Sequence, residues 1–194
     1  MVSALPALRP YGDAGEAQLV LERTHRWLER AVVGLNLCPF AKAVHVKQQI
    51  RFVVTGATTR ADLLEELVQE LTLLDQADPE QLSTTLLIHP KVMGDFLAFN
   101  AFLEEADAAV EALELNGVLQ VASFHPDYQF ADSGPHDIEN YSNRAPYPTL
   151  HLLREESIDR AVEAFPDPEA IFGENMKTLR RLGHSGWAAL FEDG

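Results

Sequence analysis

Two histidines each stand directly before a proline, at the end of an apolar segment. His89 precedes Pro90, and His125 precedes Pro126. A proline restricts the residue before it to extended geometry, so each histidine is expected to be the last residue of a strand. If these two strands run parallel, both imidazoles lie at the carboxyl edge of the sheet, where open α/β sheets bind ligands. A later antiparallel strand would begin at that edge and bring His151 close to them.

Three imidazoles at one edge have the chemistry of a metal site. His89, His125 and His151 match the ligand set of a catalytic zinc, iron or manganese centre that keeps one position open for substrate. Their spacing contains no established metal-binding motif such as HExxH or a pair of CxxC sequences. The simpler alternative is that these histidines hydrogen-bond at the ends of their strands and hold no ligand.

Acid–base chemistry without a metal is a second hypothesis for the same edge. His125 and Asp127 would form an oriented imidazole that acts as a base, and Asn140 or Arg144 would stabilise negative charge on a substrate. The segment 125–148 is longer than an ordinary connection, which is typical of a lid or a binding loop. The residues predicted to bind the substrate are Lys91, Tyr128, Asn140, Asn143 and Arg144.

These residue types favour a small anionic ligand. Two predicted helices also begin at this edge, near residues 58 and 94, and the free N–H groups of a helix start suit an anion. The leading hypothesis is an enzyme, a hydrolase or a group transferase, that acts on such a ligand. A non-catalytic module that binds or senses a small anion or a metal would use the same residues. A scaffold whose histidines are only structural is the third alternative.

The chain contains one cysteine, Cys38, which is followed by Pro39 and Phe40. This sequence superficially resembles the Cys-Pro of thioredoxin-like redox proteins. In those proteins the cysteine follows a strand and opens a helix, whereas here a predicted helix precedes it. No second cysteine is present to resolve a disulfide. A redox role for Cys38 therefore competes with the role of an inert buried thiol.

The spacing of apolar residues predicts the elements that position these side chains. Alternation or short apolar runs predict strands over 50–54, 85–88, 118–124 and 149–153. Apolar residues that recur every three or four positions predict helices over 14–36, 63–78, 95–116 and 157–165. A last helix is expected to begin with Asp167 as its cap and Pro168 at its first position, and to end near Gly183.

This order of elements predicts an α/β fold. Its core is β-α-β-α-β, a long loop and a fourth strand, which form a small mixed sheet of about four strands with helices packed on it. An N-terminal helix and two C-terminal helices complete the fold. Strand–helix–strand units favour parallel pairing of the first three strands, with the fourth antiparallel. Residues 1–13 are predicted to be a loose tail, and residues 14–194 a single domain.

Length and charge exclude several classes of protein. The 194 residues are 46% hydrophobic and 23% charged, which is ordinary for a soluble globular domain. The 30 Asp and Glu outnumber the 15 Lys and Arg, and the net charge of −15 opposes contact with nucleic-acid phosphates. No apolar stretch reaches the roughly 18 residues of a membrane span, and the N-terminus lacks the pattern of a signal peptide. We therefore expect a cytoplasmic protein with no nucleic-acid or membrane partner.

Three segments resemble the signature blocks of an uncharacterised bacterial family, the domain of unknown function 1415. They are GLNLCPFA at 34–41, ASFHPDYQF at 122–130 and NRAPYPTLHLLR at 143–154. The resemblance extends from about Leu28 to Leu182, which is nearly the whole chain. It implies that the three segments act as one unit, and it implies no activity, cofactor or substrate.

Overall fold

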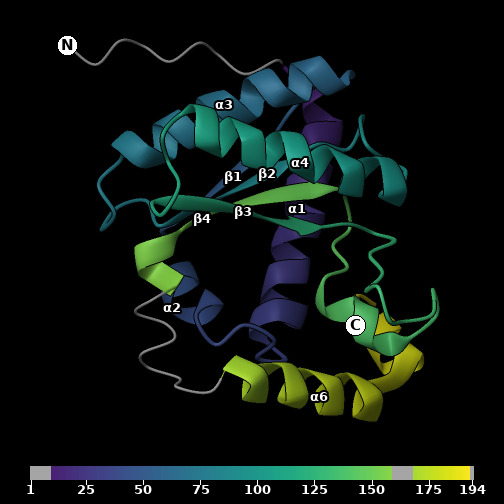
Figure 1. Ribbon diagram of the computed structural model, residues 1–194. Helices are drawn as coiled ribbons and strands as arrows, with labels where there is room; N and C mark the ends of the chain where they lie inside the picture. The colour runs from purple at the N-terminus through teal and green to yellow at the C-terminus, as the bar shows by residue number, and fades with distance from the viewer. Residues whose placement is uncertain (1–9, 159–167, 193–194) are drawn as a thin grey trace.

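A four-stranded mixed sheet is the centre of the computed structural model, which describes residues 10–158 and 168–192 (Figure 1). The strands lie in the order β1-β2-β4-β3, with β1 parallel to β2 and β4 antiparallel to both β2 and β3. The predicted α/β fold with a small mixed sheet is therefore confirmed. The strand bounds are β1 (Ile50–Val54), β2 (Thr84–Ile88), β3 (Leu119–Phe124) and β4 (Thr149–Arg154).

The place of β4 differs from the prediction. We expected the first three strands to pair side by side, but β4 lies between β2 and β3. All five residues of β2 are buried, and Leu150 and Leu152 of β4 are fully buried, whereas β3 is more exposed and forms an edge. The most apolar strands therefore occupy the centre, where both faces of the sheet are covered. β1, β2 and β3 still run in one direction, as predicted.

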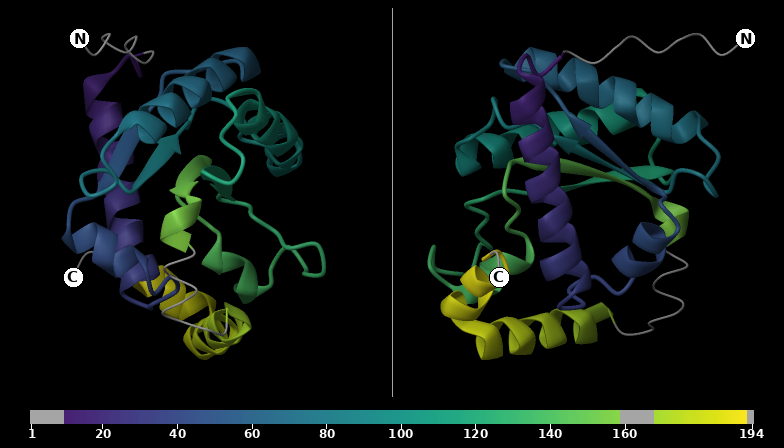
Figure 2. Two further views of the ribbon diagram at one scale, coloured as in Figure 1. Left: turned by 60° about the vertical axis from the view of Figure 1, so that its left-hand side comes forward. Right: turned by 180° about the vertical axis from the view of Figure 1, so that it is seen from behind.

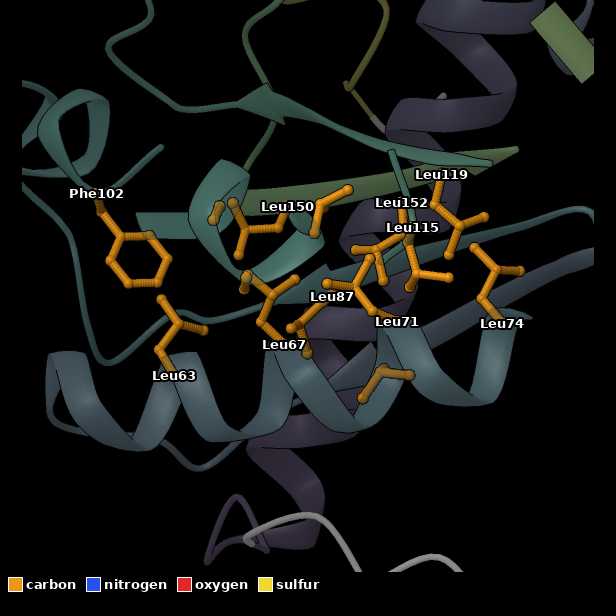
Figure 3. Packing of buried hydrophobic residues seen from close by; sticks show 14 of the residues in the cluster. Leu63, Leu67, Leu71, Leu74, Leu87, Phe102, Leu115, Leu119, Leu150 and Leu152 are labelled. Carbon is orange, nitrogen blue, oxygen red and sulfur yellow. The ribbon is translucent and has the colours of Figure 1, made fainter. Parts of the chain in front are cut away.

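Two helices, α3 (Arg60–Gln76) and α4 (Phe96–Ala112), cover one face of the sheet (Figures 1 and 2). Thr59 and Asp95 cap them through side-chain oxygens that accept backbone N–H groups of the first turn. Leucines at intervals of three or four along α3 meet the inward leucines of β2, β3 and β4 (Figure 3). The main core is thus formed by Leu63, Leu67, Leu71, Leu74, Leu87, Phe99, Phe102, Leu119, Leu150 and Leu152.

The opposite face of the sheet is covered by the N-terminal helix α1 (Ala14–Trp27) (Figure 2). Its helical path continues as a π-helix, η1 (Leu28–Val33), and a short helix, α2 (Ala41–Val46), follows. Val20 of α1 packs on Leu86 and Ile88 of β2, and Trp27 packs edge-on against Phe124 of β3. Of the predicted loose tail, Tyr11 is held by Lys91 and Asp13 caps α1, while residues 1–9 lie outside the described chain.

The loop 125–148 contains a short 3₁₀ helix, η2 (Ile138–Ser142), on which the last helix, α6 (Pro168–Ala189), packs. Gly183 has φ 64° and ψ 176°, which is not helical, so the helix that begins at Pro168 ends there as predicted, and a second helical segment follows this kink within α6. The part after the kink places Trp187 against Tyr141, with ring centroids 5.2 Å apart. The predicted helix over 157–165 and the Asp167 cap lie mostly outside the described residues, which resume at 168.

Candidate functional site

His89 lies at the end of β2 and is fully buried on the α4 side of the sheet. Its Nδ1 donates to the carbonyl of Val92 at 3.0 Å, because a carbonyl can only accept. Its Nε2 is buried and makes no hydrogen bond with any described residue. Burial is the main cause that lowers the pKa of His89 to about 4, so the ring is neutral at pH 7.

His125 lies at the end of β3 and is also fully buried. Its Nε2 donates to the carbonyl of Met93 at 3.2 Å, and its Nδ1 accepts the backbone N–H of Asp127 at 3.0 Å. Burial lowers the pKa of His125, which opposes the smaller effect of the nearby Asp127 carboxylate. Both ring nitrogens are therefore occupied by the backbone, which indicates that His125 positions the loop that follows β3.

The structure brings two of the three predicted histidines together and separates the third. His89 and His125 both pack on Phe99, at 5.3 Å between ring centroids in each case. His151 is in the middle of β4, opposite Leu86 and Ala122, and points to the other face of the sheet. It does so because Leu150 and Leu152 on either side of it fill the core under α3 and α4, and successive residues of a strand alternate between faces.

The three-histidine metal site therefore does not form in this structure. No group of three His, Cys, Asp or Glu side chains is placed to hold a metal within residues 10–158 and 168–192. The expectation that His151 joins the other two rested on β4 beginning at their edge of the sheet. β4 does begin there, but His151 comes two residues after its first residue, Thr149, and lies on the opposite face from the other two histidines.

The predicted substrate-binding asparagines hold the long loop in shape. Asn140 is fully buried; its Oδ1 accepts from the backbone N–H of Phe130 and the hydroxyl of Ser133, and its Nδ2 donates to the carbonyl of Gly134. The Oδ1 of Asn143 accepts from the hydroxyl of Ser142 at 3.0 Å, and its backbone carbonyl accepts the N–H of His125 at 3.2 Å. These bonds lie within the loop or between its two ends, so the asparagines give the loop a fixed conformation rather than facing a ligand.

Four other predicted residues are dispersed. The ammonium of Lys91 donates to the carbonyl of Tyr11 and lies over its ring. The Tyr128 ring packs between Phe96 and Phe130. Asp127 is exposed at the start of the loop. Cys38 is a free, half-buried thiol on the α1 side of the sheet.

Arg144 is the predicted residue that lies in a cavity. The cavity has a volume of about 500 Å³ and lies between α1, the long loop and the end of α6. We call it the arginine cavity. Its wall contains three arginines, and no Asp or Glu among the described residues. The lining is Arg23, Arg26, Trp27, Pro126, Tyr141, Arg144, Ala145, Pro146, Trp187 and Phe191.

The guanidinium of Arg144 is held rigidly. Its Nε donates to the carbonyl of Tyr128 at 3.1 Å, and its Nη2 to the carbonyl of Pro135 at 2.7 Å. Its plane lies over the ring of Tyr141, with 4.5 Å to the ring centroid. These bonds use two of the five N–H groups of the side chain, so a fixed guanidinium retains donors for an anion.

The other two arginines of this cavity were not among the predicted site residues. Arg23, Arg26 and Trp27 are three and four residues apart, which places them on one face of α1. The sequence pattern predicts that both arginines face solvent, because they stand between the apolar positions of the helix. The signal that distinguishes them is their position beside Trp27, which is buried. Arg23 also donates to the hydroxyl of Tyr147 at 3.1 Å, which fixes it toward the long loop.

The fold and the cavity define the class of the protein. It is an α/β protein with a four-stranded mixed sheet, in which the loop before β4 and two terminal helices enclose an arginine-lined cavity. Within the described part of the chain, no helix is both long enough and apolar enough to cross a bilayer.

The chain belongs to the family described as protein of unknown function DUF1415, which matches residues 19–189. The matched range contains all four strands of the sheet and every residue of the arginine-cavity lining except Phe191. No curated protein and no solved structure matches the chain.

Proposed function

We propose that the protein binds a small anionic molecule that carries a planar ring, and that the ligand occupies the arginine cavity. The observation that carries this proposal is the gathering of Arg23, Arg26 and Arg144 around one cavity whose described lining contains no carboxylate. The chain as a whole has a net charge of −15. The described wall therefore offers Arg23 and Arg144 no carboxylate, and the anionic group of a ligand would balance their charge there.

The chemistry of the wall specifies the ligand further. Guanidinium groups form paired hydrogen bonds with phosphate or carboxylate oxygens, and these bonds are stronger than those between neutral groups. The rest of the wall includes Trp27, Tyr141, Trp187 and Phe191, whose faces and edges suit a planar ring. A cavity of about 500 Å³ is within the usual range for a small-molecule site.

The geometry favours binding over catalysis by His125. A general base must reach the ligand with a free nitrogen, whereas both nitrogens of His125 bond to backbone groups and its ring is fully buried. The proposal therefore corresponds to the non-catalytic alternative, a module that binds or senses a small anion. The hydrolase or group-transferase hypothesis needs a reacting group that lies in the arginine cavity itself.

The test uses phenyl phosphate, which combines an anion with a planar ring. Isothermal titration at constant ionic strength should show binding that is tighter than that of inorganic phosphate. Arg144→Gln and Arg23→Gln should each weaken it at least tenfold, since each removes a charged partner of the phosphate. The control is Arg60→Gln, because Arg60 is exposed and pairs with Glu105 on the other side of the sheet.

Three results decide the question. Binding that is unchanged in Arg144→Gln, or weakened equally in Arg60→Gln, would contradict a specific site in the arginine cavity. Release of phenol during the titration, lost in Arg144→Gln, would instead support the hydrolase hypothesis. Binding without release of phenol supports the binding module.

A further inference from the structure

A second cavity lies on the α1 side of the sheet and is separate from the proposed anion site. Its volume is about 370 Å³. It is lined by the end of α1, by η1 and α2, by Ser157 and Ile158 after β4, and by the face of the sheet that carries Ile50, Leu86 and Phe124. We call it the apolar cavity, because its described lining contains no Asp, Glu, Lys or Arg. A charged ligand would therefore lose its hydration there without gaining an oppositely charged side chain from the described lining.

One imidazole, that of His151, forms part of the wall of the apolar cavity. The ring packs near Phe124, at 5.6 Å between centroids, and makes no hydrogen bond with a described residue. Burial lowers the pKa of His151 to about 4, so the ring is neutral at pH 7. A neutral imidazole has one N–H donor and one acceptor nitrogen, and both remain for a ligand.

The helix beside the cavity has an uncommon geometry. In η1 the backbone N–H of Gly34 donates to the carbonyl of Glu29, and that of Leu37 to the carbonyl of Val32, each across five residues. Leu28 and Val32 of this π-helix line the apolar cavity. π-Helices are rare and are frequent at functional sites, because the wider turn displaces side chains that an α-helix would pack closely.

We propose that the apolar cavity binds an uncharged small molecule made of an apolar ring or chain and one hydroxyl group, which hydrogen-bonds to His151. Typical ligand pockets have this character, with an apolar wall and a few polar groups that orient the ligand. A hydroxyl can accept a hydrogen bond from the protonated ring nitrogen or donate one to the unprotonated nitrogen. It therefore suits either tautomer of a neutral imidazole. This proposal does not depend on the arginine cavity.

The single thiol of the chain makes the proposal directly measurable. Cys38 lines the apolar cavity and is half-buried, and no other cysteine competes for a thiol reagent. The rate at which N-ethylmaleimide modifies Cys38, followed by mass spectrometry, should therefore report whether the cavity is filled. The probe is 4-propylphenol, which is uncharged at pH 7, and propylbenzene is the matched probe without a hydroxyl.

We expect saturating 4-propylphenol to slow the modification of Cys38 at least tenfold and to shift the ¹⁵N resonances of the His151 ring. His151→Phe should remove the preference for 4-propylphenol over propylbenzene. Leu153→Trp, which fills the cavity from β4, should abolish protection by either probe. Leu97→Trp is the control, because Leu97 is 76% exposed on α4, on the far side of the sheet.

Measurements on the unaltered protein are sufficient to overturn the proposal, whether or not the variants fold. Failure of 4-propylphenol to protect Cys38 would show that the apolar cavity is not a binding site. Equal protection by 4-propylphenol and propylbenzene, with unchanged His151 resonances, would overturn the role of the hydroxyl and of His151. Protection that persists in Leu153→Trp would place the ligand elsewhere.

Discussion

A neutral imidazole buried at the end of β2 makes the stability of the protein depend on pH. The pKa of His89 is about 4 in the folded protein and near 6.5 in an unfolded chain. The unfolded chain therefore takes up the proton first. The contribution of His89 to the free energy of unfolding is fully present above about pH 6.5 and decreases as the pH falls toward 4. At pH 4 this loss is about 3 kcal/mol.

His89→Asn tests this dependence, because an asparagine amide keeps a donor for the Val92 carbonyl but does not titrate. Urea unfolding between pH 7 and pH 4 should show a smaller decrease in stability for the variant than for the parent protein. His136→Asn, at an exposed position in the long loop, should leave the decrease unchanged. Identical pH profiles for His89→Asn and the parent would mean that the pKa of His89 is the same in the folded and the unfolded protein.

The place of these histidines in the chain was predictable, but their partners were not. A following proline predicts that His89 and His125 end their strands, and they do. The carbonyls that they bond belong to the turn after β2, where Met93 has φ 58°. Nothing in the local sequence predicts that a methionine adopts this left-handed conformation. The hydrogen bonds of the two imidazoles therefore depend on the conformation of this turn, which the presence of histidine alone does not predict.

A buried arginine at the end of β4 joins the sheet to the C-terminal end of α3. Arg154 is 7% exposed, and its guanidinium donates to the carbonyls of Leu74, Ala77 and Leu82. The last carbonyls of a helix have no partner within the helix, and a cation there also interacts favourably with the helix dipole. Arg154 is therefore a C-terminal cap supplied by a distant element.

Arg154→Ala should lower the free energy of unfolding by about 3 kcal/mol, because it leaves buried carbonyls without donors. Arg154→Lys should restore only part of this stability. An ammonium still donates hydrogen bonds, but it cannot reach three carbonyls in the geometry of the guanidinium. Urea unfolding monitored by circular dichroism measures both. The exposed pair of Arg60 and Glu105 supplies the control, because Arg60→Ala should cost less than about 1 kcal/mol. Comparable losses in the two alanine variants would contradict the capping role.

At the scale of elements, the hydrophobic pattern predicts what forms but not what each element meets. The strand over 50–54 and the helix that Asp95 caps lie where their spacing predicts. The insertion of β4 between β2 and β3 was not predictable, because it depends on how the loop 125–148 returns the chain. The helix α2 has only six residues, too few to give a periodic signal.

At the scale of the whole molecule, the N-terminal helix α1 forms part of the wall of both cavities. The arginine cavity and the apolar cavity both lie on the α1 side of the sheet, and Trp27 lines both of them. Local sequence did not predict this, because the docking of α1 on the sheet depends on contacts with β2 and β3 far along the chain. The chain has 30 acidic residues, yet neither of the two described linings contains one.

A shared wall predicts a shared effect. Trp27 is 2% exposed, and Trp27→Phe removes part of the aromatic surface that faces each cavity. We expect this variant to lower the affinity for phenyl phosphate and for 4-propylphenol by about fivefold each. This factor corresponds to the loss of roughly 1 kcal/mol of apolar contact. Titration of each probe measures the two effects separately.

The other tryptophan of the chain provides the matched control. Trp187 lines the arginine cavity and not the apolar cavity. Trp187→Phe should therefore weaken the binding of phenyl phosphate and leave that of 4-propylphenol unchanged. Arg144→Gln should likewise spare 4-propylphenol, and Leu153→Trp should spare phenyl phosphate. If Trp27→Phe changed the affinity of one probe only, Trp27 would not be a wall common to two binding sites. If Trp187→Phe weakened both probes, the two cavities would respond as one, because a side chain in the first would then affect a ligand in the second.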